Sequence, residues 1–201
     1  MGLFTIGHTH HTHEEFLKLL RMHDINYILD VRSTPYSKFA EQFNREIIEK
    51  FLRRNGVAYN FMGKYFGARQ TDTSLYTTEG YLDFEKTIGT EQFQMGVRNV
   101  ILGLNKGNNI ALMCTEKDPF DCHRAIMVAR AFSLQGIEVN HILADGQIES
   151  HASIDEMLLD KYFPDRFQIS LFEEEISDEE RLRRAYQKRN KDIGYHIQKE
   201  E

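Results

Sequence analysis

The side chains best suited to chemistry are concentrated in one short stretch, residues 114–124, which holds both cysteines of the chain. Its reactive members are Cys114, Glu116, Cys122, His123 and Arg124. Thiolates act as nucleophiles and metal ligands, an imidazole transfers protons near neutral pH, and a guanidinium binds oxyanions. The stretch therefore predicts catalysis or anion binding, with Glu116 orienting an imidazole.

The local pattern predicts that this stretch is a turn between a buried strand and a helix. Residues 110–113 are a short apolar run, as in strands that a parallel sheet buries on both faces. Pro119 cannot continue a strand ladder, and Asp121 is a favourable N-cap for the following helix. The carboxyl end of a strand is where open α/β sheets bind ligands, and a helix N-terminus favours an anion or a thiolate.

The rest of the chain alternates between expected strands and helices. Strands are expected at residues 4–8, 26–32, 57–62, 110–113 and 138–143, with amphipathic helices between them. Residues 68–80 are polar and weakly periodic, which predicts a long loop that acts as a lid or binding segment. This order is typical of a single three-layer α/β domain with a mostly parallel five-stranded sheet over residues 1–150. Residues 151–201 are expected to form a C-terminal helical extension of the same domain.

Parallel strands would bring their polar ends to one rim of the sheet. These ends carry His8, Asp30, Arg32, Lys64, Cys114 and Glu116, and the turn adds Cys122, His123 and Arg124. In the main hypothesis Cys114 or Cys122 is the nucleophile, and His8 or His123 carries the proton. The anion is expected to bind Arg32, Arg124 and Lys64, while structural or orienting roles are expected for Asp30, Gly7 and Pro119.

Less reactive roles are open for the same residues. Cys114 follows Leu112 and Met113 and fits a buried small hydrophobe, and Arg32 fits an ion pair with Asp30 that braces the loops. Rhodaneses and cysteine phosphatases offer the nearest mechanism, but their arginine follows the cysteine at a short fixed distance. Here the first arginine after Cys114 is Arg124.

Two other function classes are alternatives to this enzyme. Cys114, Cys122, His123 and His8 could form the metal site of a hydrolase or a metal-stabilised module, although seven residues separate the thiols where zinc sites usually have two to four. A non-catalytic nucleotide or nucleic-acid binder would use basic residues around the long loop, namely Arg32, Arg53, Arg54, Lys64 and Arg69.

Composition sets the remaining bounds. The 201 residues carry a net charge of -6, which does not favour duplex nucleic acid. No apolar run reaches the roughly 20 residues of a membrane span, and no signal peptide is expected. Two cysteines in a chain of this size indicate the reducing cytoplasm. The main hypothesis includes a small anionic ligand, such as phosphate, sulfate or a nucleotide-like molecule, and neither a cofactor nor a metal.

Several of these motifs together resemble one known family. They are Thr5-Ile-Gly7-His8, Asp30-Val31-Arg32 followed by Pro35 and Ser37, and Cys114-x-Glu116-x-x-Pro119-x-x-Cys122-His123-Arg124. With Ala185-Tyr186 and Ile193-Gly194-Tyr195 near the end, the chain is similar over nearly its whole length to a bacterial and archaeal family, domain of unknown function 488. Met62-Gly63-Lys64 departs from the Leu-Gly-Gly expected there. The resemblance implies a single α/β domain and a shared site, and no established reaction.

Overall fold

The structure of the protein is a computed structural model that describes residues 1–9, 11–167 and 176–197. The described part forms a six-stranded sheet in the order β3-β2-β4-β1-β5-β6. The strands are β1 (Leu3–Gly7), β2 (Tyr27–Asp30), β3 (Ala58–Phe61), β4 (Ile110–Cys114), β5 (Val139–Ile142) and β6 (Ile148–Ser150). All neighbours pair in parallel except β5 and β6. The predicted α/β class and mostly parallel sheet are confirmed.

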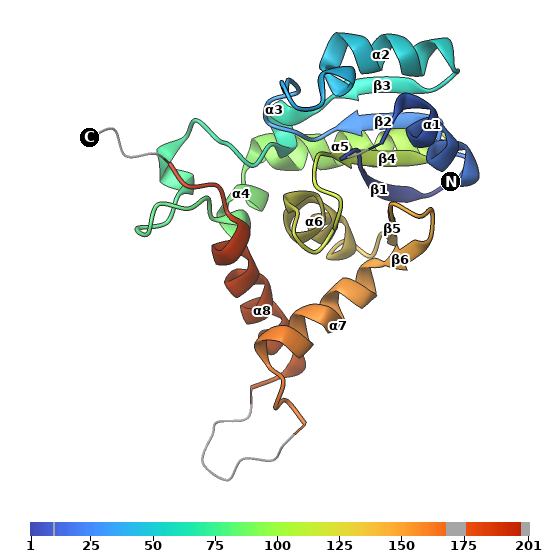
Figure 1. Cartoon of the computed structure of the whole chain (residues 1–201). Coiled ribbons are helices and arrows are strands. Elements are labelled where there is room, and N and C mark those ends of the chain that lie inside the picture. The colour runs from blue at the N-terminus through green and yellow to red at the C-terminus, as the bar shows by residue number, and fades with distance from the viewer. Residues whose placement is uncertain (10, 168–175, 198–201) are drawn as a thin grey trace.

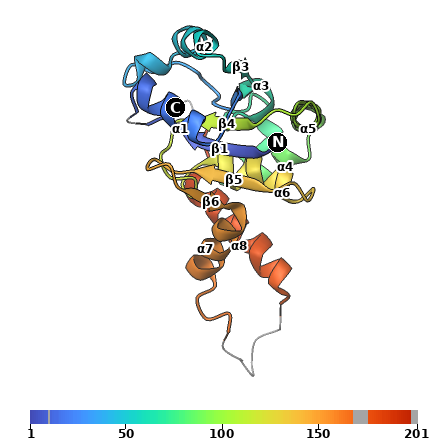
Figure 2. The ribbon, with the colours of Figure 1, turned by 90° about the vertical axis from the view of Figure 1, so that its right-hand side faces the viewer.

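The helices cover both faces of the sheet, as Figures 1 and 2 show. They are α1 (His13–Met22), η1 (Glu41–Phe43), α2 (Arg45–Arg54), α3 (Gly63–Phe66), η2 (Thr73–Leu75), α4 (Phe84–Ile88), α5 (Glu91–Asn105), the π-helix η3 (Arg124–Ala129), α6 (Arg130–Ser133), α7 (His151–Tyr162) and α8 (Asp178–Ile193). None of the helices in the described ranges is long and apolar enough to cross a membrane.

Two hydrophobic clusters form the core, one on each face of the sheet. Alternate residues of β4 divide between them, because Ala111 and Met113 join the first cluster while Leu112 and Cys114 join the second. The first cluster is covered by α1 and α2, and the second by α5, η3 and α6. The result is the predicted three-layer architecture.

This topology leaves a crevice at the carboxyl end of β4. The chain leaves β1 and β2 toward the face that α1 and α2 cover, whereas it leaves β4 toward the opposite face. Because β4 lies between β1 and β2, neighbouring loops separate at this point. Open α/β sheets bind ligands at such switch points, so strand order places the 114–124 turn where a ligand site is expected.

The sixth strand corrects the prediction of five. After β5, a turn with Gly146 at φ 88° leads back into β6, which pairs antiparallel with β5 at the edge of the sheet. Three residues are too few for a period-two pattern to be recognised in the sequence. The predicted division at residue 150 coincides with the start of α7, although residues 168–175 and 198–201 of the predicted extension lie outside the described residues.

Side-chain caps begin several of the helices. Thr12 and Glu15, spaced as Thr-x-x-Glu in the sequence, form a capping box at the start of α1. Asp121 was wrongly predicted as an N-cap: the helix begins later, at Arg124, and the Asp121 carboxylate pairs with Arg189 of α8. Ser150 caps α7, where its side chain accepts from the backbone N–H of Ser153.

Candidate metal centre

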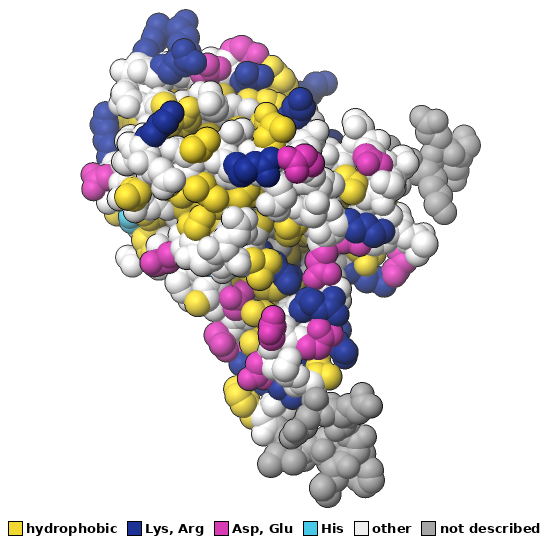
Figure 3. Space-filling view, turned by 180° about the vertical axis from the view of Figure 1, so that it is seen from behind, with side chains coloured by type: hydrophobic (Ala, Val, Ile, Leu, Met, Phe, Trp, Pro, Cys, Tyr) yellow, Lys and Arg dark blue, Asp and Glu magenta, His cyan; other side chains and the backbone are white. Residues whose placement is uncertain are grey.

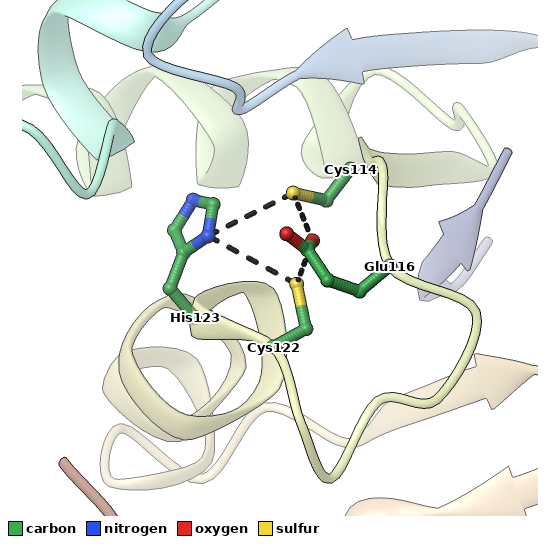
Figure 4. Close-up of side chains that lie close together, drawn as sticks. All are labelled: Cys114, Glu116, Cys122 and His123. Atoms are coloured by element: carbon green, nitrogen blue, oxygen red, sulfur yellow. Dashed lines mark hydrogen bonds between the residues drawn. The ribbon is translucent and has the colours of Figure 1, made fainter. Parts of the chain in front are cut away.

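Four side chains of the 114–124 turn converge on one point, and we call them the Cys-Glu-Cys-His cluster: Cys114, Glu116, Cys122 and His123 (Figure 4). The carboxylate oxygen Oε2 of Glu116 lies 2.9 Å from Sγ of Cys114 and 2.8 Å from Sγ of Cys122. On the other side, Nδ1 of His123 lies 3.7 and 3.9 Å from the same two sulfurs. One potential ligand atom from each residue lies within 4.8 Å of all the others.

The backbone fixes three of these residues and leaves the fourth on a loop. Cys114 is the last residue of β4, and the backbone N–H of Cys122 donates to the carbonyl of Pro119, which tightens the turn before η3. Gly7 lies opposite Cys114, where an added Cβ would meet the Glu116 carbonyl oxygen at 2.0 Å. Gly7 and Pro119 therefore both contribute to the shape of this turn. Glu116 itself is an exposed residue whose carboxylate reaches inward to the buried thiols.

A hydrogen bond of the His123 ring determines which nitrogen faces the sulfurs. Nε2 of His123 lies 3.2 Å from the carbonyl oxygen of Val31, which has no proton to donate. Nε2–H is therefore the donor, so Nδ1 faces the cluster and presents a lone pair to it whenever the ring is neutral. Metal-ligating histidines are usually oriented in this way, by donating the other ring N–H to a carbonyl or carboxylate.

Arg124 has a different environment from the one its predicted role requires. Its side chain is fully buried, and it donates to Oγ1 of Thr5 and to the backbone carbonyls of Glu116 (2.6 Å) and Lys117 (3.1 Å). All of these acceptors are neutral, yet a buried charge is costly unless an opposite charge lies nearby. The adjacent thiol of Cys122, which also accepts the backbone N–H of Arg124, can supply that charge as a thiolate.

The two thiols differ in electrostatic environment. Burial raises the pKa of the Cys114 thiol well above its ordinary value. Burial also opposes ionisation of Cys122, but the Cys114 hydrogen bond, the Arg124 charge and His123 together hold the pKa of Cys122 well below its ordinary value. Burial raises the pKa of Glu116. The arrangement thus favours negative charge on Cys122 first.

Arg32 and His8 lie beside the cluster and bond mainly to each other and to Asp30. Arg32 is buried and forms a two-point ion pair with Asp30, at 2.9 and 2.6 Å. Its Nη1 lies 3.1 Å from Nε2 of His8, whose ring stacks on Phe43. Burial and the Arg32 charge lower the pKa of His8 to about 3, so this ring is neutral and accepts from Arg32. The structure therefore contains the ion pair between Arg32 and Asp30 that was considered as the alternative to anion binding by Arg32.

A cavity of about 260 Å³ opens beside the cluster. Its walls come from the end of β2, the start of the long loop, the 114–123 turn and the C-terminal segment: Arg32, Ser33, Thr34, Ala68, Arg69, Cys114, Thr115, Glu116, Asp121, His123, Ile193 and Tyr195. Four predicted site residues do not contribute to these walls: His8, Lys64, Cys122 and Arg124. Of these, Lys64 is exposed to solvent on α3. A larger cavity of about 520 Å³, between α4, α6, α7 and α8, is lined by other residues.

Arg69, Tyr195 and the hydroxyls of Ser33 and Thr34 are cavity residues that we did not assign to the site from sequence. The sequence analysis named Arg69 only in the nucleic-acid alternative. It lies, however, in the 68–80 loop that was predicted to act as a lid or binding segment. Tyr195 is brought in from the far end of the chain by backbone hydrogen bonds between Leu82 and Tyr195 (2.9 Å) and between Ile197 and Gly80 (3.0 Å). The Ile-Gly-Tyr motif at 193–195 was the only sequence signal for it.

The two thiols and the imidazole of the cluster have the donor types and spacing of a transition-metal site, whereas Oε2 of Glu116, 2.9 and 2.8 Å from the two sulfurs, is placed as a hydrogen-bond acceptor. Zn–S bonds of about 2.3 Å and Zn–N bonds of about 2.0 Å in a tetrahedron place sulfur and nitrogen about 3.5 Å apart. The observed separations of 3.7 and 3.9 Å are close to this value. The metal alternative was therefore right about Cys114, Cys122 and His123 lying together, whereas Glu116, and not His8, is the fourth member.

Comparison with known proteins gives a family without an activity. Residues 12–131 match the model of the family described as Domain of unknown function DUF488. The match covers the Cys-Glu-Cys-His cluster but neither the N-terminal Thr5–His8 motif nor the C-terminal Ile193–Tyr195 motif, so it is shorter than the resemblance suggested. Neither a curated protein nor a solved structure matches the chain. The chain belongs to the DUF488 family.

Proposed function

We propose that this protein is a metal-dependent enzyme that acts on a small anionic molecule, with a divalent transition metal ion of the zinc type bound by the Cys-Glu-Cys-His cluster. The observation that carries the proposal is the convergence of two thiols, one carboxylate and the Nδ1 lone pair of His123 on one point. Sulfur and imidazole donors select zinc and related metals over magnesium or calcium. The proposal departs from our sequence-based expectation that no metal is bound.

Access to the cluster favours catalysis over a purely structural metal. Structural zinc sites are closed by four protein ligands, whereas catalytic sites keep a position for water or substrate. Cys114, Glu116 and His123 all contribute to the cavity wall, so a ligand in the cavity would reach the metal. Glu116 comes from the loop, and its carboxylate is the ligand best placed to give way to water or substrate. A bound metal would polarise a carbonyl or phosphoryl oxygen and lower the pKa of bound water.

The other hypotheses have less support. A cysteine nucleophile with an anion-binding arginine would need Arg124 in the cavity, but Arg124 is buried and bonded to the loop backbone. For nucleic-acid binding, Figure 3 shows Lys and Arg side chains gathered at the end of the molecule where Figure 1 draws α2, with acidic side chains among them. On α2, Arg53 is paired with Glu49. A cytoplasmic location is part of the proposal, because thiolate ligands stay reduced there.

Metal content tests the proposal directly. The full chain without a histidine tag would be freed of metal, incubated with Zn²⁺ or Co²⁺, passed through a desalting column and measured by elemental analysis. We expect about one equivalent of metal, and for Co²⁺ intense visible bands with thiolate-to-metal charge transfer, as a tetrahedral thiolate site requires. Cys122→Ser and Glu116→Gln should lower metal retention, the former strongly.

Glu14→Gln, a substitution of an exposed glutamate on α1, is the matched control and should retain metal as the wild type does. Circular dichroism of each variant separates loss of metal from loss of fold. If the folded wild type retains neither metal, or if Cys122→Ser retains both fully, the proposed metal centre is refuted.

A further inference from the structure

Two arginines line the cavity beside the cluster, and within the described residues Arg69 alone of the two has no carboxylate partner. Arg32 is paired with Asp30. The acidic side chains of the cavity bond elsewhere, Asp121 to Arg189 and Glu116 to the thiols of the cluster. The Arg69 guanidinium instead lies over the ring of Tyr195, 4.7 Å from its centroid. Stacking occupies one face of the guanidinium and leaves its N–H edge available for a ligand.

The sequence around Arg69 holds it at this position. The backbone N–H of Arg69 donates to Oγ of Ser33 at 2.9 Å, which joins the long loop to the end of β2. Two glycines permit this close approach, because a Cβ on Gly63 would meet the Arg32 carbonyl at 2.2 Å and one on Gly67 would meet Ser33 Oγ at 2.8 Å. Gly63 and Gly67 thus allow the backbone approach that positions Arg69 at the cavity.

Hydrogen bonds also fix the C-terminal segment, which carries Tyr195 into the cavity wall. Asn190 of α8 accepts from the backbone N–H of Phe84 and donates to the carbonyl of Leu82, both at 2.8 Å, so the end of α8 is fixed to the 82–84 segment. Gly194 then lets the chain turn against Asn190, since a Cβ there would lie 2.7 Å from the Asn190 carbonyl oxygen. Tyr195 follows and reaches Arg69. The aromatic support for the guanidinium is therefore built into the fold.

We infer that Arg69 is the anion-binding residue of this cavity and that the substrate is a small molecule bearing a phosphate or carboxylate group. This inference rests on the proposed function only for the chemistry at the metal. An arginine fork binds either oxyanion through two parallel hydrogen bonds, and the hydroxyls of Ser33 and Thr34 line the same wall. The cavity volume of about 260 Å³ lies just below the usual range of roughly 300–1,000 Å³ for ligand pockets, which favours a small molecule.

Anion binding by Arg69→Gln tests the inference. Isothermal titration calorimetry would measure inorganic phosphate and acetate binding to the full chain, with and without Zn²⁺. We expect Arg69→Gln to weaken binding of the preferred anion by about tenfold or more, the factor that corresponds to about 1.4 kcal/mol. The preferred probe identifies the anionic group of the substrate. Arg53→Gln, at an exposed arginine of α2, is the matched control and should bind as the wild type does.

The outcomes separate this inference from the proposed metal centre. Metal content of Arg69→Gln should equal that of the wild type, because Arg69 is not a member of the cluster. If the metal-free chain binds an anion in an Arg69-dependent way while no metal is retained, the anion site stands and the metal centre fails. If wild type and Arg69→Gln bind both anions equally, or the wild type binds neither, the anion site is refuted.

Discussion

Acid should destabilise the fold through His151, a buried histidine at the start of α7. Its Nδ1 lies 3.1 Å from Nε2 of His141, and its Nε2 lies 3.0 Å from the hydroxyl of Tyr186. His141 continues the chain to Oγ1 of Thr5 at 2.8 Å. The Tyr186 hydroxyl donates to Asp155, so His151 Nε2–H must be a donor and Nδ1 an acceptor. This arrangement requires a neutral ring, and protonation would disrupt it.

The pKa of His151 gives the size and sign of the effect. Burial, and then the Arg130 charge, lower this pKa from 6.5 to about 4. Between these values the unfolded chain binds a proton that the folded chain does not, so stability is complete above pH 6.5 and is lost as pH falls toward 4. From about pH 7 to about pH 4.5 the His151 contribution falls by about 2 kcal/mol, with a limit of about 3 kcal/mol at lower pH. Burial raises the pKa of Asp155, which opposes the loss at still lower pH.

Urea unfolding of wild type and His151→Gln at these two pH values isolates the effect. Glutamine keeps a donor and an acceptor but does not titrate. His141 bonds directly to His151, so the difference between the two proteins reports on the His141–His151 pair. The wild type should lose about 2 kcal/mol more than the variant between the two pH values. His196→Gln, at an exposed position, is the control and should behave as the wild type. Equal acid losses in wild type and His151→Gln would refute the reasoning.

Three further predictions concern the geometry of the site. Gly7→Ala places a methyl group 2.0 Å from the Glu116 carbonyl oxygen, so it should destabilise the fold by about 1–3 kcal/mol in urea unfolding and lower metal retention; unchanged values would contradict the packing argument. Asp30→Asn leaves the Arg32 charge buried without its counterion and should cost about 3 kcal/mol, and a loss below about 1 kcal/mol would show that the pair is not needed. Gly194→Ala should weaken phosphate or acetate binding in calorimetry while metal content stays constant, and equal loss of both would mean a general disruption.

Much of the fold could be predicted because its determinants are local. The buried run at residues 110–113, the Thr12 capping box and Gly56 at the end of α2, with φ 78°, each depend on a few neighbouring residues. Parallel pairing then follows from the alternation of strands and helices. β6 was missed because it is only three residues long, and Asp121 was misassigned because its partner, Arg189, is 68 residues away.

The part of the site that could be predicted is the part that lies within a single turn of the chain. Cys114, Glu116, Cys122 and His123 lie within ten residues, so a strand-turn-helix pattern was enough to place them together. His8 was expected in the same group because it follows a neighbouring strand. Sequence spacing could not show that its ring would stack on Phe43 and bond to Arg32, a contact that depends on η1 packing over the end of β1.

The three arginines near the site explain why residue type alone did not identify the anion-binding residue. Arg32 has a carboxylate partner, and Arg124 is buried among backbone carbonyls beside a thiol, where its charge favours a thiolate. Only Arg69 combines exposure, a place in the cavity wall and, within the described chain, no ion pair. Arg32 and Arg124 direct most of their donors at the protein itself. In our proposal these two arginines therefore organise the site, and the anion binds the arginine whose side chain has no ion pair among the described residues.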